Sequence, residues 1–399
     1  MENNQNTIKW FSLAGIWFGG IVSVPALLVG STLITSLSFG HSILAGLIGF
    51  SFVVLFMSLL SISAVEKRKA TVSLASSSFG EHGAKLIVGL VIGLSTLGWF
   101  GIQSNIAGAS FSKILIEMNG PEIPVWLSSV FWGTIMVITA VFGFKSLKWL
   151  NYIAVPAIVL LLIYGLVVTF KTHSFQEILS FKPQEKMPLL QAIGFTIGFI
   201  SVGGVISPDY NRFAATKKDA ILGSVFGIIP SAICLLAVGA ILAITQGTYD
   251  IVDIFSTLGF PFFAMSILIL ATWTSNVMNI YSSGLAFNDL FKLNNAQRSK
   301  TTLVVGGVGI LLAAFGILTH FMSFITLLTI TITPIAGVMI SDYYISKTCQ
   351  ETPQKVNWKG VISWGSGVPL MLVMTSQIKN ILGIIVAALA YYLLKKNIK

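Results

Sequence analysis

The chain has 399 residues, of which 55% are hydrophobic and only 10% are charged. Soluble domains carry about 25% charged residues, so this composition excludes a large soluble protein and indicates an integral membrane protein. The net charge of +10 does not indicate a nucleic-acid partner, because the basic residues are scattered among short loops. The two cysteines and four histidines lack the spacing of a disulfide framework or a metal site.

Long apolar runs follow one another along the chain, each close to the length of about 20 residues that a membrane-spanning helix needs. Because backbone exposed to lipid must satisfy its own hydrogen bonds, these runs are predicted to be twelve transmembrane helices. We expect them at 11–35, 41–64, 86–112, 125–143, 149–170, 189–206, 220–245, 261–287, 302–319, 321–343, 359–376 and 379–394.

The distribution of basic residues predicts the orientation of these helices. If the N-terminus is cytoplasmic, most of the 24 lysines and arginines fall in cytoplasmic segments, as the positive-inside rule requires. The tails 1–10 and 395–399 are therefore both predicted to be cytoplasmic.

Two runs contain helix-weakening residues. Gly19-Gly20 and Pro25 lie in the first run, and Gly203-Gly204 and Pro208 lie in or just after the sixth. A broken helix persists in a membrane only where it is buried in protein or lines a cavity. The alternative is ordinary close packing of helices through glycine.

The position of these two runs favours a transporter. They are corresponding members of two five-span halves, 11–170 and 189–343, which are followed by two further spans within 359–394. Broken helices at matching places in two halves point to the central site of a transporter.

Trp99 lies near the centre of the third run, far from the membrane interface that normally attracts an indole. On a helix, Gln103 lies one turn away on the same face. A flat aromatic surface with an amide beside it is suited to a planar, neutral, hydrogen-bonding ring. The alternative is that Trp99 packs and Gln103 bonds a neighbouring helix.

The eighth run has an unusual density of hydroxyl and amide groups for a membrane interior, where an unpaired polar group is costly. Thr274 and Ser275 offer neutral oxygens, which an alkali cation takes together with backbone carbonyls such as those freed near Gly19 to Ser23. Asn276 and Asn279 can each donate and accept hydrogen bonds. Bonds between helices are the alternative for each of these side chains.

No Asp, Glu, Lys or Arg lies near the middle of any run. Such residues mark proton relays and charged-substrate sites, so their absence favours a neutral substrate and a metal cation as coupling ion. Neither a phosphate-binding loop nor a catalytic constellation is evident, and we predict that the chain is not an enzyme.

Two connecting segments carry further expectations. The segment from Glu66 to Lys85 is expected to form a short interfacial helix or to be solvated. In the loop after the sixth run, Asp209 and Arg212 are expected to pair or to cap the following helix.

Several motifs taken together are similar to those of one known family. They are Gly98-Trp99-Phe100-Gly101-Ile102-Gln103, Ser207 to Phe213, Trp273-Thr274-Ser275-Asn276, Tyr281 to Gly284, Ser77 to Gly80 and Pro334 to Tyr343. The chain resembles the nucleobase–cation symporters of the purine-cytosine permease family, and within it the bacterial cytosine permeases. The resemblance implies a LeuT-like fold of two inverted five-helix repeats plus two C-terminal helices, working by alternating access.

The resemblance also implies roles for residues in the substrate site. Trp99 resembles the aromatic residue that stacks on the heterocycle, and Gln103 the amide that hydrogen-bonds it. Asn276 falls on the asparagine of the eighth-span motif, and Asn279 is the neighbouring candidate.

The sodium site that the resemblance implies combines backbone and side-chain oxygens from the first and eighth spans. Its members here are the backbone near Gly20 and Ser23, the carbonyl of Ala271 and the hydroxyls of Thr274 and Ser275.

This chain departs from the cytosine permeases at two places. Thr96 stands where they carry a glutamine, three residues before the tryptophan. Their second aromatic residue falls at Ile200 in exact register and at Phe199 after a shift of one, next to the further candidate Ser201. A planar heterocycle remains the expected substrate.

The sequence therefore predicts a symporter in the bacterial inner membrane that imports a neutral heterocycle, cytosine first among the candidates, with sodium. It predicts no other cofactor and no obligate protein partner. The alternatives are a proton-coupled transporter of allantoin, hydantoin, a purine or hydroxymethylpyrimidine, and an amino-acid transporter on the same fold, which would leave Trp99 and Gln103 without a role.

Overall fold

The chain is helical almost throughout in a computed structural model, which describes residues 7–142, 147–257, 261–346, 354–373 and 379–396. Among the described residues, each apolar run predicted from the sequence lies largely in helix, so the all-α membrane class is confirmed. The elements are α1 (Trp10–Ile21), α2 (Val24–Ile34), α3 (Phe39–Lys67), α4 (Thr71–Phe79), α5 (Glu81–Ala84), η1 (Lys85–Gly89), α6 (Leu90–Glu117), α7 (Val125–Phe142), α8 (Leu147–Thr172), α9 (Phe175–Ser180), α10 (Leu189–Asn211), α11 (Lys217–Gln246), α12 (Ile251–Ser256), α13 (Pro261–Leu290), η3 (Asn295–Gln297), α14 (Arg298–Ala314), η4 (Ile317–His320), α15 (Phe321–Ile340), η5 (Ser341–Ser346), α16 (Trp358–Val373) and α17 (Lys379–Lys396).

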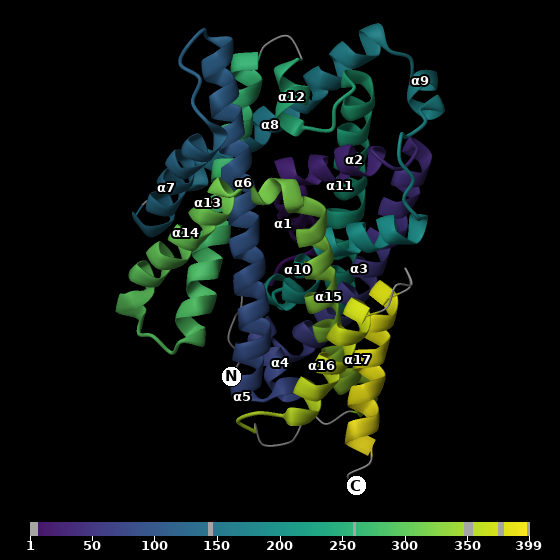
Figure 1. The fold of residues 1–399 in the computed structure, drawn as a ribbon. Coiled ribbons are helices and arrows are strands. Elements are labelled where there is room, and N and C mark those ends of the chain that lie inside the picture. The colour runs from purple at the N-terminus through teal and green to yellow at the C-terminus, as the bar shows by residue number, and fades with distance from the viewer. Residues whose placement is uncertain (1–6, 143–146, 258–260, 347–353, 374–378, 397–399) are drawn as a thin grey trace.

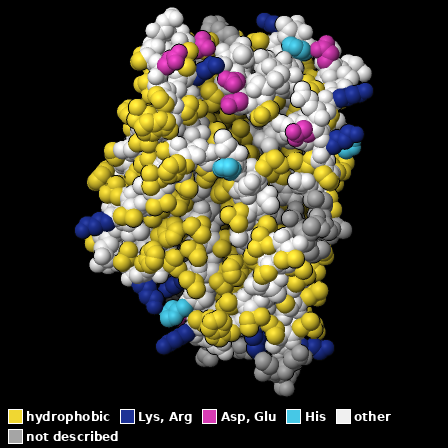
Figure 2. Space-filling model, in the orientation of Figure 1, with side chains coloured by type: hydrophobic (Ala, Val, Ile, Leu, Met, Phe, Trp, Pro, Cys, Tyr) yellow, Lys and Arg dark blue, Asp and Glu magenta, His cyan; other side chains and the backbone are white. Residues whose placement is uncertain are grey.

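Within the described ranges, eight helical segments are long and apolar enough to cross a membrane, or nine if the bent pair α1–α2 is one span. Helices α14 and α16 have 17 and 16 residues, and α17 carries lysines at both ends. The count of twelve spans therefore stays a prediction, as do the two inverted repeats and the cytoplasmic tails, whose residues 1–6 and 397–399 lie outside the described residues. On the face shown in Figure 2, charged side chains lie mainly toward the two ends and the rim, with apolar side chains between them.

The first span is broken, as predicted. Helices α1 and α2 meet at an angle of 62° across Val22 and Ser23. Gly19 and Gly20 lie in the last turn of α1, where no atom lies within 4 Å of the position that a Cβ would take. Pro25 lies in the first turn of α2, where a residue without an N–H is tolerated. The break thus lies between the glycines and the proline.

The predicted break in the sixth span is wrong, because α10 is one helix that includes Gly203, Gly204 and Pro208. A Cβ on Gly204 would lie 2.5 Å from the Phe56 ring of α3, so this glycine serves close packing between helices. Pro208 lies in the last turn of α10, where the loss of one hydrogen bond does not end the helix until Asn211.

Helix α6 is the central element of the bundle. It packs along α13 and α7, while α10 packs against α3 and α15. With α5 and η1 it forms a segment of 37 residues, Glu81–Glu117, which runs vertically through the middle of Figure 1. Trp99 lies midway along this segment, as the sequence predicts.

The segment between Glu66 and Lys85 contains the short helices α4 and α5, as one of its two expectations requires, and its interfacial position stays a prediction. Asp209 accepts a hydrogen bond from the Thr71 backbone N–H at 2.8 Å, and so caps a helix distant in sequence. The expected roles of Asp209 are wrong: Thr216 caps α11, and within the described ranges Asp209 and Arg212 form no ion pair. Sequence proximity did not decide this contact, because α4 is folded back onto the end of α10.

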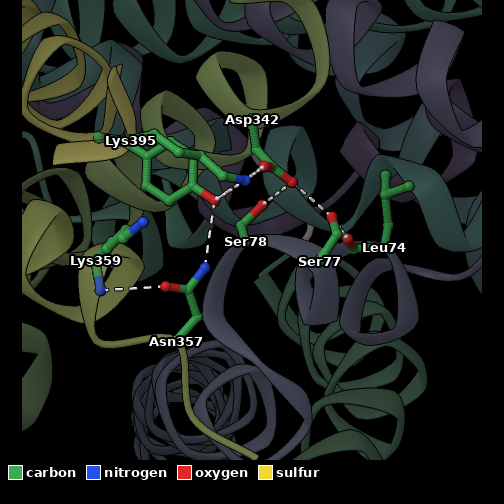
Figure 3. Close-up of polar contacts among 8 residues, drawn as sticks. Leu74, Ser77, Ser78, Asp342, Asn357, Lys359 and Lys395 are labelled. Carbon is green, nitrogen blue, oxygen red and sulfur yellow. Dashed lines mark hydrogen bonds and ion pairs between the residues drawn. The ribbon is translucent and has the colours of Figure 1, made fainter. Parts of the chain in front are cut away.

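The last helix, α17, is joined to the rest of the bundle through Asp342 (Figure 3). One carboxylate oxygen accepts from Lys395 Nζ at 3.0 Å and from the Tyr391 hydroxyl at 2.9 Å. The other oxygen accepts from the hydroxyls of Ser77 at 2.7 Å and Ser78 at 3.1 Å. This cluster connects α4, η5 and α17.

Candidate substrate and ion site

Trp99 lies inside an aromatic cluster formed by three helices. Its ring centroid is 5.8 Å from that of Phe199 on α10, and 5.3 and 6.0 Å from those of Phe324 and Phe321 on α15. All three pairs are steeply inclined, between 67° and 87°, an arrangement that aromatic quadrupoles favour. Trp99 is 9% exposed, so its indole is nearly enclosed.

Of the two positions left open by the sequence, Phe199 is the one whose ring lies against Trp99, and Ile200 is buried in the core. The two rings are not a preformed sandwich. Parallel rings that hold a planar ligand between them lie about 7 Å apart, twice the optimal carbon–carbon separation. Phe199 would therefore have to rotate from its inclination of 79° to stack on such a ligand.

The α15 contacts were missed by sequence reasoning. Phe321 and Phe324 are three residues apart at the start of a run, and this spacing places both on one helix face. That spacing was the available signal. Gly98 permits the contact, because a Cβ there would overlap the Phe324 ring.

Gln103 is held next to α13, one turn from Trp99. Its side chain is buried, and its Oε1 accepts a hydrogen bond from the Ser275 hydroxyl at 2.5 Å. Across the described part of the chain, its NH2 group has no protein partner. The amide can therefore offer a donor to a bound molecule.

The predicted ion ligands of α13 gather around one carbonyl. The Thr274 hydroxyl donates to the Ala271 carbonyl oxygen at 2.9 Å, and the Ser275 hydroxyl oxygen lies 3.1 Å from the same carbonyl oxygen. Three neutral oxygens within one helical turn form a donor set that suits an alkali cation.

The other predicted ion ligands lie at the break in the first span, and α2 packs against α13. Ser23 donates to the Ile21 carbonyl, and Gly20 is in the last turn of α1. A helix end leaves its last carbonyls without helical partners, so the break can supply backbone oxygens. Among the described residues, no hydrogen bond joins Gly20 or Ser23 to α13.

The two asparagines of α13 differ in their surroundings. Asn276 is fully buried, and its Nδ2 donates to the Phe100 carbonyl and to Ser104, both at 3.0 Å, with Met136 Sδ at 3.2 Å. This is the interhelical role that the sequence left as an alternative. Asn279 is half-buried and donates to Asn276 Oδ1 at 3.4 Å, so it remains the more accessible amide.

The remaining candidates bond within their own helices. The Thr96 hydroxyl donates to the Ile92 carbonyl at 2.9 Å, and the Ser201 hydroxyl to the Gly198 carbonyl at 2.9 Å. The structure therefore gathers the candidates into two groups. Trp99, Phe199 and Gln103 form one, the α13 hydroxyls form the other, and the Ser275–Gln103 hydrogen bond joins them.

Two solved structures share this fold. The inward-facing conformation of Mhp1 superposes with a TM-score of 0.86 at 20% identity, covering 100% of this chain and 94% of that one. A closed conformation of Mhp1, a nucleobase-cation-symport-1 family transporter, with bromovinylhydantoin bound, gives 0.80 at 21% identity, covering 98% and 94%. The fold is that of a multi-pass membrane transporter, and the LeuT-like expectation is confirmed.

Sequence comparison identifies the family. The model for permeases for cytosine/purines, uracil, thiamine and allantoin matches residues 1–392, and the chain belongs to that family. The cytosine permease of Escherichia coli is 28% identical, covering 90% of this chain and 82% of the relative. The hydantoin permease of Microbacterium maritypicum is 25% identical, covering 91% and 78%. The predicted family is thus confirmed, and its matching members are permeases rather than enzymes.

Proposed function

We propose that this permease imports a small, neutral, planar heterocycle together with sodium across the bacterial inner membrane, and that cytosine is the first candidate substrate. One observation carries the proposal: Trp99 lies in an aromatic cluster at the middle of α6, and Gln103 one turn away has an amide NH2 without a protein partner. Stacking and a few amide hydrogen bonds are sufficient for micromolar binding, about 8 kcal/mol. The similarity to the Escherichia coli cytosine permease supports cytosine.

The proposed mechanism is alternating access. Sodium binds between the α1–α2 break and the oxygens of Ala271, Thr274 and Ser275, and orders the broken helix. Affinity for a ring stacked on Trp99 rises, and the loaded bundle opens inward. Because coupling between two sites is reciprocal, substrate should tighten sodium binding by the same factor.

A second candidate substrate is a hydantoin or allantoin-type ring. It is supported by Thr96, which stands where the cytosine permeases carry a glutamine and whose hydroxyl donates within α6. The hydantoin permease similarity points the same way.

The test is thermal unfolding of the detergent-purified protein with a panel of nucleobases, hydantoins, allantoin and amino acids, each in sodium chloride and in choline chloride. We expect a sodium-dependent rise in unfolding temperature for one heterocycle, which Trp99→Ala abolishes. Trp126→Ala is the matched control, because Trp126 is a tryptophan of α7 that is 53% exposed. Stabilisation by amino acids alone would overturn the substrate class, and equal stabilisation in choline would overturn sodium coupling.

A further inference from the structure

The Ser275 hydroxyl lies between the proposed ion site and the proposed substrate site. Its Oγ is 2.5 Å from Gln103 Oε1, 3.1 Å from the Ala271 carbonyl oxygen and 3.3 Å from that of Thr272. A hydroxyl has one hydrogen and two lone pairs. Ser275 can therefore give its full hydrogen bond to Gln103 or to its own helix, but not to both.

We infer that Ser275 is a positioning residue that passes the state of the ion site to the Gln103 amide. The inference rests on the proposed function, since it assumes that sodium binds at the Ala271 carbonyl. A cation at this carbonyl repels a hydrogen that points toward it and attracts the lone pairs of the Ser275 oxygen. The hydrogen is then directed to Gln103 Oε1.

The orientation of the Gln103 amide follows from this hydrogen bond. With Oε1 held by Ser275, the amide presents its NH2, a donor, to the substrate. If the hydrogen goes instead to the Ala271 or Thr272 carbonyl, which lie 3.1 and 3.3 Å from the Ser275 oxygen, the Gln103 amide loses this hydrogen bond and can rotate. Sodium thus prepares the substrate site before the heterocycle arrives, which reduces the ordering that binding requires.

A specific demand on the ligand follows. The substrate edge that meets Gln103 must carry an acceptor, either a carbonyl oxygen or an unprotonated ring nitrogen. The neighbouring amide of Asn276 cannot replace this donor, because its NH2 is engaged by the Phe100 carbonyl and by Ser104.

Sodium affinity measured without substrate distinguishes this role from simple substrate binding. Gln103 is not an ion ligand in the proposed site, so a pure substrate role leaves sodium affinity unchanged. In Gln103→Leu the Ser275 hydrogen returns to the Ala271 carbonyl and competes with the ion. We expect sodium affinity to fall about two- to tenfold, the range that corresponds to one hydrogen bond.

The experiment titrates sodium chloride against choline chloride at constant ionic strength and follows the unfolding temperature of the purified protein. Gln103→Asn keeps the amide but shortens it by one methylene, and serves as a second variant with the same expected fall. Trp99→Phe is the matched control on the same helix face, expected to weaken heterocycle binding while leaving the sodium titration unchanged.

Two results would overturn the inference. If both Gln103 variants bind sodium like the unmodified protein while losing the heterocycle, Gln103 is a substrate ligand only. The proposed function then stands, but the link from the ion site to Gln103 through Ser275 is wrong. If the unmodified protein shows no sodium-dependent stabilisation, sodium coupling itself is wrong, and so is the proposed role of Ser275.

Discussion

The carboxylate of Asp342 and the ammonium of Lys395 form a buried ion pair at 3.0 Å, with side chains only 2% and 9% exposed. Two buried charges are tolerated when their remaining hydrogen-bonding capacity is filled. Here Ser77, Ser78 and Tyr391 fill that of the carboxylate, as Figure 3 shows for the two serines. The pair therefore connects α17 to α4, although these helices are far apart in the sequence.

Breaking this pair from one side should be strongly destabilising. Lys395→Met removes the ammonium that faces this buried carboxylate, and the expected loss in free energy of unfolding is about 3–5 kcal/mol. The double variant Asp342→Asn/Lys395→Met removes both charges and should lose less than Lys395→Met alone. Unfolding in detergent measures the loss for each variant of the double-mutant cycle.

Lys396→Met is the matched control for this cycle. Lys396 is the neighbouring residue on α17 but is exposed, and its ammonium lies over the Tyr392 ring. Its replacement should change stability by no more than about 0.5 kcal/mol. Equal losses in Lys395→Met and Lys396→Met would show that the buried pair is not the connection between the helices.

Phe199 should contribute to substrate affinity, and Ile200 should not. Stacking of a base on an aromatic side chain is worth about 1–3 kcal/mol, so Phe199→Ala should weaken heterocycle binding about five- to hundredfold. Ile200→Val trims a buried methylene beside it and should leave affinity unchanged. Equilibrium binding of the identified heterocycle compares the two, and an effect of Ile200→Val as large as that of Phe199→Ala would show that the register of α10 at the site is different.

Gly98 should be required for the contact between Trp99 and Phe324. A methyl group at this position overlaps the Phe324 ring, and such overpacking typically lowers stability by about 1–3 kcal/mol. The double variant Gly98→Ala/Phe324→Leu makes room for the methyl group and should recover most of the loss. Thermal unfolding tests this, with Gly307→Ala as the control, because open space surrounds that glycine. Failure of Phe324→Leu to rescue Gly98→Ala would indicate a different cause.

The helices followed from the sequence because the length of an apolar run is set by the membrane, independently of neighbours. The break in the first span followed for a similar local reason, with glycines and Pro25 close together. The continuous helix of the sixth span could not be predicted in this way, because the role of Gly204 depends on Phe56 of another helix. The sequence alone does not distinguish a glycine that ends a helix from one that allows another helix to pack closely.

The contacts among the candidate site residues could not be predicted from the sequence. Neighbouring positions on a helix point about 100° apart, so choosing Phe199 over Ile200 requires the rotation of α10. In the same way, Asp342 is in sequence a single carboxylate at the end of a run, and its partners Ser77 and Lys395 come from distant segments. Substrate and ion roles of the site residues remain predictions.

Asn276 and Asn279 should respond differently to truncation, because one connects helices and the other is accessible. Asn276→Ala removes the hydrogen bonds to the Phe100 carbonyl and Ser104, and should lower stability by about 1–2 kcal/mol. Asn279→Ala removes only a bond of 3.4 Å to Asn276 and should leave the unfolding temperature of the unliganded protein nearly unchanged.

The same two variants separate a structural amide from a substrate amide. If Asn279 contacts the heterocycle, Asn279→Ala lowers the affinity about tenfold, as expected for one hydrogen bond of about 1 kcal/mol or slightly more. Asn276→Ala should leave the heterocycle affinity of the folded protein unchanged, because the NH2 of Asn276 is already bonded to the Phe100 carbonyl and to Ser104. The reverse pattern, with full stability and lost binding in Asn276→Ala, would mean that the amide leaves α6 when substrate binds, and that Asn276 is itself the ligand.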